Sequence, residues 1–351
     1  MTVPTPPRIL VDRRKFCGFI LGAGAALAAR AAESKTPAAS TTLPLGPLED
    51  SAVRLIALDP RFHGLFPSTP VISRVQTGSI WSEGPAWSPA GRYLVWSDIP
   101  NNRQLRWLED DGHVSVFRQP SHETNGSTFD FQGRMYTCEQ QGHSVVRHET
   151  DGTQTVLASE VGGVRFNSPN DIAVHADGGV WFTDPGYGGP DPMPQREAIY
   201  RIDQVSGAVE RVDSTLVKPN GVCFSPDFKR LYAADTGMPA PKALYVYDVV
   251  GGKRLANKRL FATIEHGGKV AGPDGQQTDV DGNLWSSAGN GPDGVNGVHV
   301  FSPDGVRLGL VLLPETCANL CFGGTGRNRL FMTATTSLYT IDTATRGAHL
   351  S

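Results

Sequence analysis

The stretch Ser88-Pro-Ala-Gly-Arg-Tyr-Leu-Val-Trp-Ser-Asp98 joins a small polar turn to an apolar run that ends in an acid. A stretch of the same kind returns five more times along the chain. The further copies occupy residues 130–139, 175–184, 225–235, 279–288 and, in a more degenerate form, 324–334. Short apolar runs bounded by Gly and Asp turns predict β-strands, and their regular return predicts an architecture built from repeated units.

An oxygen-bearing polar residue lies five positions before the start of each copy. The six residues are Glu83, Asn125, Asn170, Asn220, Asp274 and Asn319. Consecutive members are 42 to 54 residues apart, close to the length of one four-stranded propeller blade. A β-sandwich or barrel of the same strands gives no reason for one polar residue at a constant phase, whereas the inner strands of a propeller bring equivalent positions to one axis. We therefore expect an all-β fold, a six-bladed β-propeller with a central channel.

The strands of the first blade can be assigned in this interpretation. They begin with an inner strand at Glu83 and continue at 92–98, 104–108 and 114–118. A further strand at 71–76 precedes this blade. We expect it to pair with residues 338–342, so that the two ends of the repeat complete the last blade together and close the ring.

Composition and charge exclude several classes of protein. The 40 glycines and 26 prolines among 351 residues are too many for a helical bundle and lack the period of collagen. The 32 basic and 35 acidic residues give a net charge of −3, with no basic run outside the N-terminus, which argues against a nucleic-acid partner. No apolar stretch is long enough to span a membrane. We expect a small-molecule partner, no nucleic acid and no membrane.

The N-terminus has the features of an export signal. Arg13-Arg14-Lys15 is followed by largely small or apolar residues and then by Ala29-Arg30-Ala31, which fits a cleavage site. The alternative, a short buried helix, does not explain this order of cationic, apolar and small residues. The paired arginines resemble a twin-arginine signal. We expect residues 1–31 to be a signal peptide that engages the twin-arginine export machinery, and the protein to be periplasmic. We expect residues 32–47 to be a disordered linker and residues 48–351 to be the propeller hydrolase domain.

Four cysteines follow the expected signal: Cys138, Cys223, Cys317 and Cys321. An even number in an oxidising compartment permits disulfides. Their spacing provides no zinc framework, and they fall in three different expected blades. We favour free, buried thiols.

The six polar residues have two interpretations. Three of them form Asn-Gly or Asp-Gly pairs, and Asn125-Gly126, Asn220-Gly221 and Asp274-Gly275 are also typical of hairpin turns. The other three keep the same phase without such a dipeptide. Polar side chains that converge in a channel are costly unless something compensates them, and a cation does so. Carboxylate and amide oxygens favour hard ions, with Ca²⁺ first and Mg²⁺ or Mn²⁺ as alternatives.

Three segments resemble the gluconolactonase family, which includes senescence marker protein (regucalcin) and luciferin-regenerating enzyme. They are Trp81-Ser-Glu-Gly-Pro-Ala-Trp87, the stretch from Asn125-Gly-Ser-Thr-Phe-Asp130 to Glu139, and the stretch from Asn167-Ser-Pro-Asn-Asp171 to Trp181-Phe-Thr-Asp-Pro185. The likeness extends from about residue 55 to about residue 345. The family is similar in fold to diisopropyl fluorophosphatase, a six-bladed propeller with a central calcium ion.

The resemblance implies roles for particular residues. Glu83, Asn220 and Asp274 match the metal ligands, and Asn170 matches an asparagine that contacts the metal or the substrate. Asp274 also matches the general acid/base, and is the expected catalytic residue. Asn125, Asn170 and Asn319 are the expected substrate contacts. Relatives that take sugar lactones have an arginine at the position of Ser168, and this difference leaves the particular sugar undefined.

We therefore expect a metal-dependent lactonase acting on a sugar lactone. A cation polarises the lactone carbonyl and lowers the pKa of a bound water, and Asp274 accepts the proton of the attacking water. Two alternatives stay open: a phosphotriesterase-like hydrolase on the same scaffold, and a non-catalytic binding propeller with a structural ion. No Gly-x-Ser-x-Gly or His-Glu-x-x-His motif supports a serine hydrolase or a zinc protease. Tyr187 is either a substrate contact or a packed loop residue, and His122 is either a proton shuttle or a surface residue.

Overall fold

The computed structural model describes residues 53–189, 192–239 and 242–349. The expected signal peptide 1–31, the expected linker 32–47 and the first residues of the expected domain 48–351 lie outside this part of the chain. No helix among the described residues is long and apolar enough to cross a membrane. Strands make up most of the described chain, and the six-bladed β-propeller is confirmed.

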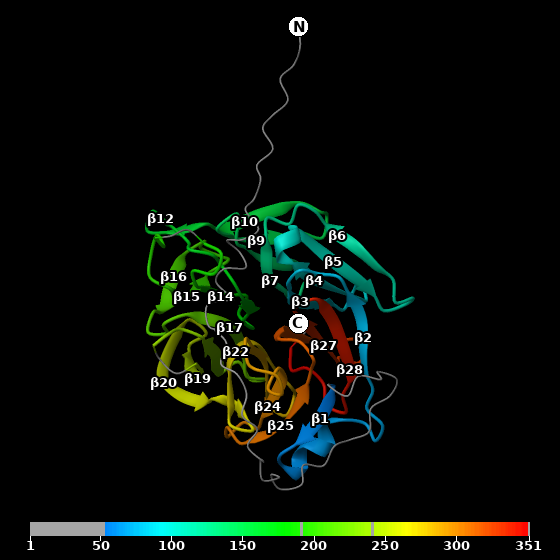
Figure 1. The fold of residues 1–351 in the computed structure, drawn as a ribbon. Coiled ribbons are helices and arrows are strands. Elements are labelled where there is room, and N and C mark those ends of the chain that lie inside the picture. The colour runs from blue at the N-terminus through cyan, green and yellow to red at the C-terminus, as the bar shows by residue number, and fades with distance from the viewer. Residues whose placement is uncertain (1–52, 190–191, 240–241, 350–351) are drawn as a thin grey trace, which may run out of the picture. The chain divides into compact units, whose positions relative to one another are not determined.

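Six antiparallel sheets are arranged around a common centre (Figure 1). The blades, each beginning with its innermost strand, are as follows: blade 1 is β3 (Ser82–Ser88), β4 (Tyr93–Asp98), β5 (Arg103–Leu108) and β6 (Val114–Arg118); blade 2 is β7 (Thr124–Phe129), β8 (Met135–Glu139), β9 (Ser144–His148) and β10 (Gln154–Ala158); blade 3 is β13 (Ile172–Val174), β14 (Val180–Asp184), β15 (Ala198–Ile202) and β16 (Val209–Asp213). The other three are these: blade 4 is β17 (Pro219–Phe224), β18 (Arg230–Asp235), β19 (Ala243–Val250) and β20 (Arg254–Ala262); blade 5 is β22 (Lys269–Thr278), β23 (Leu284–Gly289), β24 (Gly297–Phe301) and β25 (Arg307–Leu312); blade 6 is β26 (Cys317–Gly323), β27 (Arg329–Ala334), β28 (Ser337–Asp342) and β2 (Ile72–Thr77).

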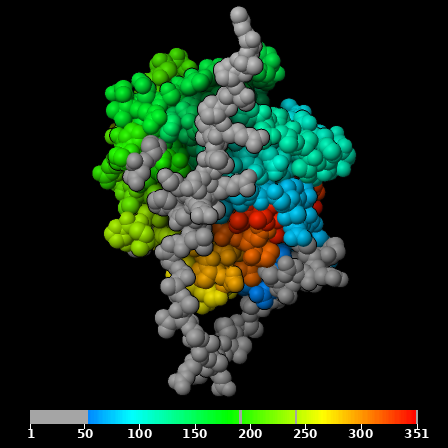
Figure 2. Space-filling view, turned by 45° about the horizontal axis from the view of Figure 1, so that its top comes forward, coloured from blue at the N-terminus to red at the C-terminus, as the bar shows by residue number. Residues whose placement is uncertain are grey.

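The ring is closed by strands from both ends of the repeat, as predicted. β2 pairs antiparallel with β28, with Ile72 opposite Ile341. Figures 1 and 2 show the blue and red ends of the colour scale side by side. The four strands predicted for the first blade also agree with β3 to β6 within one residue at each end. Hydrogen bonds of the last blade therefore join a strand near the start of the described chain to a strand near its end.

Six short elements have no counterpart in the sequence prediction, which placed the first strand at about residue 71. β1 (Arg54–Ala57) adds an outer strand to blade 5, with Leu55 opposite Val311, and the 3-10 helix η1 (Pro60–Leu65) follows it. A hairpin of β11 (Glu160–Val161) and β12 (Val164–Arg165) and the strand β21 (Ile264–His266) are also additional. Each is too short to show a period in the sequence. A second 3-10 helix, η2 (Ile99–Asn101), joins β4 to β5.

Aromatic side chains pack between neighbouring blades. Trp181 on β14 lies edge-on to Phe224 of the next blade, with ring centroids 5.7 Å apart. Trp285 on β23 makes the same contact with Phe322 at 5.3 Å. All four rings are almost completely buried. The aromatic residue in the repeat thus holds one blade against the inner strand of the next.

A hydroxyl on the second strand of a blade reaches the inner strand of its neighbour. Three such bonds are the Oγ of Ser97 donating to the carbonyl of Asn125 (2.8 Å), the Oγ1 of Thr183 donating to that of Asn220 (2.7 Å) and the Oγ of Ser287 donating to that of Ala318 (2.7 Å). All three lie at the same phase of the repeat. These bonds fix the backbone at the inner strands of the receiving blades, where the polar residues are found.

Candidate functional site

The six polar residues singled out in the sequence all lie in the innermost strands or just before one. Five are inside β3, β7, β17, β22 and β26, and Asn170 lies two residues before the first residue of β13. All six side chains are buried, with 4–7% of each residue exposed. We call them the polar ring: Glu83, Asn125, Asn170, Asn220, Asp274 and Asn319.

A one-residue bulge interrupts the inner strand at the ring position. In blade 1, Glu83 is opposite Ser97 and the next aligned residue, Ala86, is opposite Val95, so β3 has one residue more than β4. The same irregularity occurs in β7, β17, β22 and β26. Bulges change the direction of a side chain and are frequent beside functional sites. The hairpin-turn interpretation of the Asn-Gly and Asp-Gly pairs is therefore wrong, because these pairs lie within bulged strands.

The glycine after a ring residue lets neighbouring inner strands approach closely. A Cβ atom on Gly84 would lie 2.0 Å from the carbonyl oxygen of Asn125, and one on Gly221 would lie 2.0 Å from the carbonyl oxygen of Asp274. Any side chain at these positions collides with the backbone of the next blade. The glycines thus serve the close packing of the channel wall rather than turns.

Four ring side chains and one further carboxylate are connected to one another. The side-chain amide of Asn319 hydrogen-bonds to Glu83 and donates to Asp171 Oδ1 at 3.5 Å. The side chain of Asn220 hydrogen-bonds to Asp274. Glu83 also interacts electrostatically with Asp171 and Asp274. Residues from blades 1, 3, 4, 5 and 6 are thereby brought to one place.

Asn125 and Asn170 take part in the ring through their backbones. The carbonyl of Asn170 accepts a hydrogen bond from the N–H of Gly126 at 2.7 Å, and the carbonyl of Asn125 accepts one from Ser97. Among the described residues, Asn125 Oδ1 is buried without a hydrogen-bond partner. It is therefore available to a ligand or an ion in the channel.

Asp171 is a site residue that the sequence analysis missed. Its Oδ2 accepts a hydrogen bond from the N–H of Val222 at 2.8 Å, and 7% of the residue is exposed. The sequence signal that points to Asp171 is its position in the repeat, directly after a ring residue. It occupies the position that is glycine in four of the other blades, as in Gly84 and Gly221. An acid in place of a packing glycine indicates a side chain with its own role.

Three buried carboxylates dominate the electrostatics of the channel. Burial raises the pKa of Glu83 to about 7, with a further rise from the charge of Asp171. Burial also raises the pKa of Asp171 to about 6. The pKa of Asp274 rises well above its usual value, first through burial and then through repulsion by Glu83 and Asp171. The three groups resist ionising together, and a cation among them would remove that penalty.

The donor set fits a hard cation. One carboxylate oxygen of Asp274 is buried without a partner among the described residues, and an ion is a partner of the required charge. In the described part of the chain, no three His, Cys, Asp or Glu side chains are placed to hold one metal ion together. Any ion here therefore takes ligands from amides or water as well as from Glu83 and Asp274. This mixture of oxygen donors suits Ca²⁺ or Mg²⁺ rather than Zn²⁺.

Tyr187 packs against the ring from the loop after β14. Its hydroxyl hydrogen-bonds to Thr236 and to the side chain of Asn220. Burial raises its pKa above the usual range, so that it stays a neutral donor. The structure supports the packed-loop interpretation, and the contact with Asn220 gives this packing a purpose at the site.

Two other residues discussed in the sequence analysis, His122 and Ser168, differ in burial. His122 is exposed and precedes β7. Ser168 is fully buried, and its Oγ has no hydrogen-bond partner among the described residues. A Cβ on Gly189 would lie 3.3 Å from Ser168 Cβ. The loop after β14 thus covers position 168, which leaves little room for a longer side chain there.

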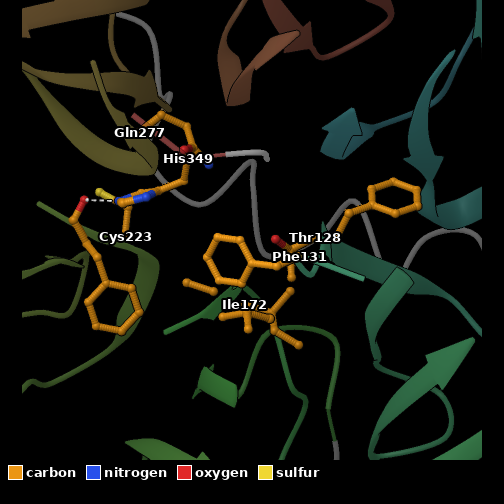
Figure 3. A pocket seen from close by; sticks show the side chains of 10 residues that line it. Thr128, Phe131, Ile172, Cys223, Gln277 and His349 are labelled. Carbon is orange, nitrogen blue, oxygen red and sulfur yellow. Dashed lines mark hydrogen bonds between the residues drawn. The ribbon is translucent and has the colours of Figure 1, made fainter. Parts of the chain in front are cut away.

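A small hollow lies at the other end of the inner strands (Figure 3). Its walls include Thr128, Phe131, Ile172, Cys223, Gln277 and His349. The Nε2 of His349 donates to the carbonyls of Phe224 and Ser225 at 3.3 and 3.1 Å. None of the six ring residues lines this hollow. It is separate from the polar ring.

The four cysteines expected in the folded domain are free and buried, as predicted. Burial raises the pKa of each thiol, and nearby carboxylates raise those of Cys138, Cys223 and Cys317 further. Neutral thiols are poor nucleophiles. They act here as packing residues.

Comparison with known proteins agrees with this fold. The family model described as SMP-30/Gluconolactonase/LRE-like region matches residues 81–336. The gluconolactonase of Zymomonas mobilis subsp. mobilis is 28% identical over 320 residues, covering 84% of this chain and 87% of that protein. A solved gluconolactonase from Xanthomonas campestris is 32% identical with a TM-score of 0.76, over 88% of this chain and 99% of that one. A regucalcin structure from Agrobacterium tumefaciens, described as a calcium-binding protein, shares the fold with a TM-score of 0.65 at 19% identity, over 77% of this chain and 94% of that one. The family match spans the whole polar ring and most of the described chain, so this protein belongs to the SMP-30/gluconolactonase/LRE-like family.

Proposed function

We propose that this protein is a lactonase that hydrolyses a sugar lactone with the help of a divalent cation held in the polar ring. The observation that carries the proposal is the buried pair of Asp274 and Glu83, with one oxygen of Asp274 left without a partner. Relatives named gluconolactonase, lactonohydrolase and pentonolactonase support the reaction class.

Glu83, Asn170, Asn220 and Asp274 are the residues that would hold the cation. Their two carboxylates offset a divalent charge, and the amide oxygens and water supply the remaining ligands. Ca²⁺ is the proposed ion because its coordination tolerates ligands from separate blades, and Mg²⁺ and Mn²⁺ are the alternatives to test. A regucalcin of the same fold is described as calcium-binding.

The reaction assigns a task to each group of residues. A cation at this place polarises a carbonyl oxygen and lowers the pKa of a nearby water. Asp274 accepts the proton of the attacking water as the acyl carbon gains its new C–O bond. The bond from that carbon to the ring oxygen then breaks, and Asp274 returns the proton to the ring oxygen. Asn125, Asn170 and Asn319 bind the substrate, with the unpartnered Oδ1 of Asn125 accepting from a sugar hydroxyl.

We further propose that residues 1–31 send the protein to the periplasm by the twin-arginine route. The support is the order of arginines, apolar residues and small residues at the N-terminus. Cell fractionation of the wild-type protein and of Arg13→Lys/Arg14→Lys tests this. We expect the wild-type protein in the periplasm and the variant in the cytoplasm, and equal distribution of both contradicts the route.

A substrate panel tests the enzymatic proposal. The full chain is treated with chelator, reloaded with Ca²⁺, Mg²⁺ or Mn²⁺, and assayed with aldonolactones, including glucono-δ-lactone, and with an organophosphate triester. We expect lactone hydrolysis that depends on the added ion and is lost in Asp274→Asn while the circular dichroism spectrum is kept. Faster turnover of the triester supports the phosphotriesterase alternative. A folded, Ca²⁺-binding protein that is inactive on every substrate supports the binding propeller.

A further inference from the structure

Two lysines lie at the channel mouth next to the polar ring. Lys218 directly precedes β17, and Lys242 directly precedes β19. The strand register brings them to the same end of blade 4, because Asp235 on β18 is opposite Pro219 on one side and Ala243 on the other. The two lysines therefore lie in comparable places, and their surroundings can be compared.

The charge of Lys218 is already compensated. Its Nζ lies 3.3 Å from Glu197 Oε1 and 4.7 Å from the ring centroid of Tyr187. The carboxylate and the aromatic face both stabilise the ammonium. Lys218 is thus part of the structure of the mouth.

Lys242 has no such partner. None of the ion pairs found among the described residues includes Lys242, although the residue is half-buried. Its stem lies across Gly272, where a Cβ would be 3.0 Å from Lys242 Cδ and 3.7 Å from Nζ. The missing side chain of Gly272 is what allows the lysine to lie there.

Gly272 and a second glycine, Gly289, place Lys242 beside Asp274. Gly272 is opposite Gly289 in the register of β22 and β23. A Cβ on Gly289 would lie 2.8 Å from Asp274 Oδ2. Lys242 and the carboxylate of Asp274 therefore lie over two glycines that face each other. In agreement, Lys242 lowers the pKa of Asp274, against the larger effects of burial and of the neighbouring carboxylates, which raise it.

A half-buried ammonium that forms no ion pair among the described residues is an anion-binding group. The proposed reaction produces an anion at this place. Hydrolysis adds water across the acyl C–O bond of the neutral lactone, so that the ring oxygen becomes a hydroxyl, the acyl carbon becomes a carboxylate and one proton goes to the solvent. The negative charge that develops near Asp274 is the ligand that Lys242 lacks.

We propose that Lys242 is an anion-binding residue of the active site, whose ammonium binds the carboxylate created when the lactone ring opens. The inference rests on the proposed lactonase function. It adds to the active site a residue that is neither in the polar ring nor among the residues implied by the sequence resemblance. Lys242 stabilises the bound carboxylate product and thereby makes the enzyme sensitive to its own product.

Inhibition by charged and neutral product analogues tests this assignment. Gluconate carries the carboxylate, and glucitol has the same hydroxyls without a charge. Lys242→Met keeps most of the stem over Gly272 and removes the charge. We expect its inhibition constant for gluconate to rise about 10- to 100-fold, the loss typical of a hydrogen bond to a charged group, with glucitol inhibition unchanged. Lys242→Arg restores most of the gluconate affinity. The gluconate effect weakens as salt is added.

Lys229 provides a matched control. Its side chain is 81% exposed in the turn between β17 and β18, at the opposite end of the inner strands. Lys229→Met leaves both inhibition constants unchanged. Equal losses for gluconate and glucitol in Lys242→Met, or no loss for either, overturn the proposal.

Calorimetric binding of gluconate to the Ca²⁺-loaded wild-type and Lys242→Met proteins separates this proposal from the proposed function. If no lactone is hydrolysed yet gluconate binds and depends on Lys242, the lactonase activity is wrong and the anion site stands. If lactones are hydrolysed and gluconate binds both proteins equally, the lactonase activity stands and the role of Lys242 is wrong.

Discussion

The carboxylate of Asp171 accepts a hydrogen bond from the backbone N–H of Val222 at 2.8 Å. This bond joins the start of blade 3 to the inner strand of blade 4. The other oxygen of Asp171 lies 3.5 Å from the amide nitrogen of Asn319 in blade 6. One buried side chain thus connects three blades at the polar ring, and it does so from a position where other blades have glycine.

Two substitutions separate the hydrogen bond of Asp171 from its charge. Asp171→Asn keeps an acceptor for Val222, whereas Asp171→Ala leaves that buried N–H without a partner. We expect the alanine variant to be less stable than the asparagine variant by about 1–3 kcal/mol, the cost of an unsatisfied buried group. Urea unfolding at one pH in the presence of chelator measures the difference. Equal stability of the two variants would mean that the bond to Val222 contributes nothing.

The close packing of inner strands predicts a severe effect at Gly221. Gly221→Ala places a Cβ 2.0 Å from the carbonyl oxygen of Asp274, so the backbone of β17 or β22 must move. We expect a loss of about 2–4 kcal/mol in the free energy of unfolding and weaker Ca²⁺ binding. Gly64→Ala is the control, because no atom lies within 4 Å of its added Cβ. The idea fails if both variants unfold at the same denaturant concentration.

The hydroxyl between blades 3 and 4 predicts a smaller effect. Thr183→Val keeps the shape of the side chain and removes the donor to the carbonyl of Asn220, which accepts it at 2.7 Å. We expect a loss of about 1–2 kcal/mol. Because Asn220 is a proposed ligand, Ca²⁺ affinity should fall as well. Thr155→Val on the exposed strand β10 should change neither quantity, and calorimetry with Ca²⁺ measures the affinity.

The channel carboxylates predict an unusual pH dependence for the protein without metal. The pKa of Glu83 is raised from 4.5 to about 7 in the folded state, so folded Glu83 retains a proton that the unfolded chain releases. Its stabilising contribution is complete below about pH 4.5 and is lost as the pH rises through about 7. Glu83→Gln should be less dependent on pH than the wild-type protein across this interval in chelator.

Added Ca²⁺ should reverse this dependence in the wild-type protein, because the ion favours the ionised carboxylates. Thermal unfolding of both proteins at several pH values, with chelator and with Ca²⁺, provides the measurement. Parallel curves for Glu83→Gln and wild type in chelator contradict the assigned pKa of Glu83.

Much of this molecule could be predicted from its repeat. The polar residue that recurs at one position of each repeat indicated the six inner strands. Residues 71–76 were predicted to be the closing strand because they precede the first blade. Other features have no local signal. Arg54–Ala57 is a strand only because it pairs with β25 of a distant blade, and the bulges are visible only in the register of paired strands. Asp171 stands at a position that is glycine in four other blades, and its role depends on its contact with Val222 in the next blade. Lys242 lies over Gly272 only in the folded chain, because the two residues are far apart in the sequence.

The strand that closes the ring also determines when folding can finish. β2 is made before any blade, yet its partner β28 comes from the far end of the chain. During synthesis on the ribosome, blades 1 to 5 can assemble in order while β2 keeps an unpaired edge. Only when residue 342 has emerged can that edge be covered. Until then the ring of six blades stays open.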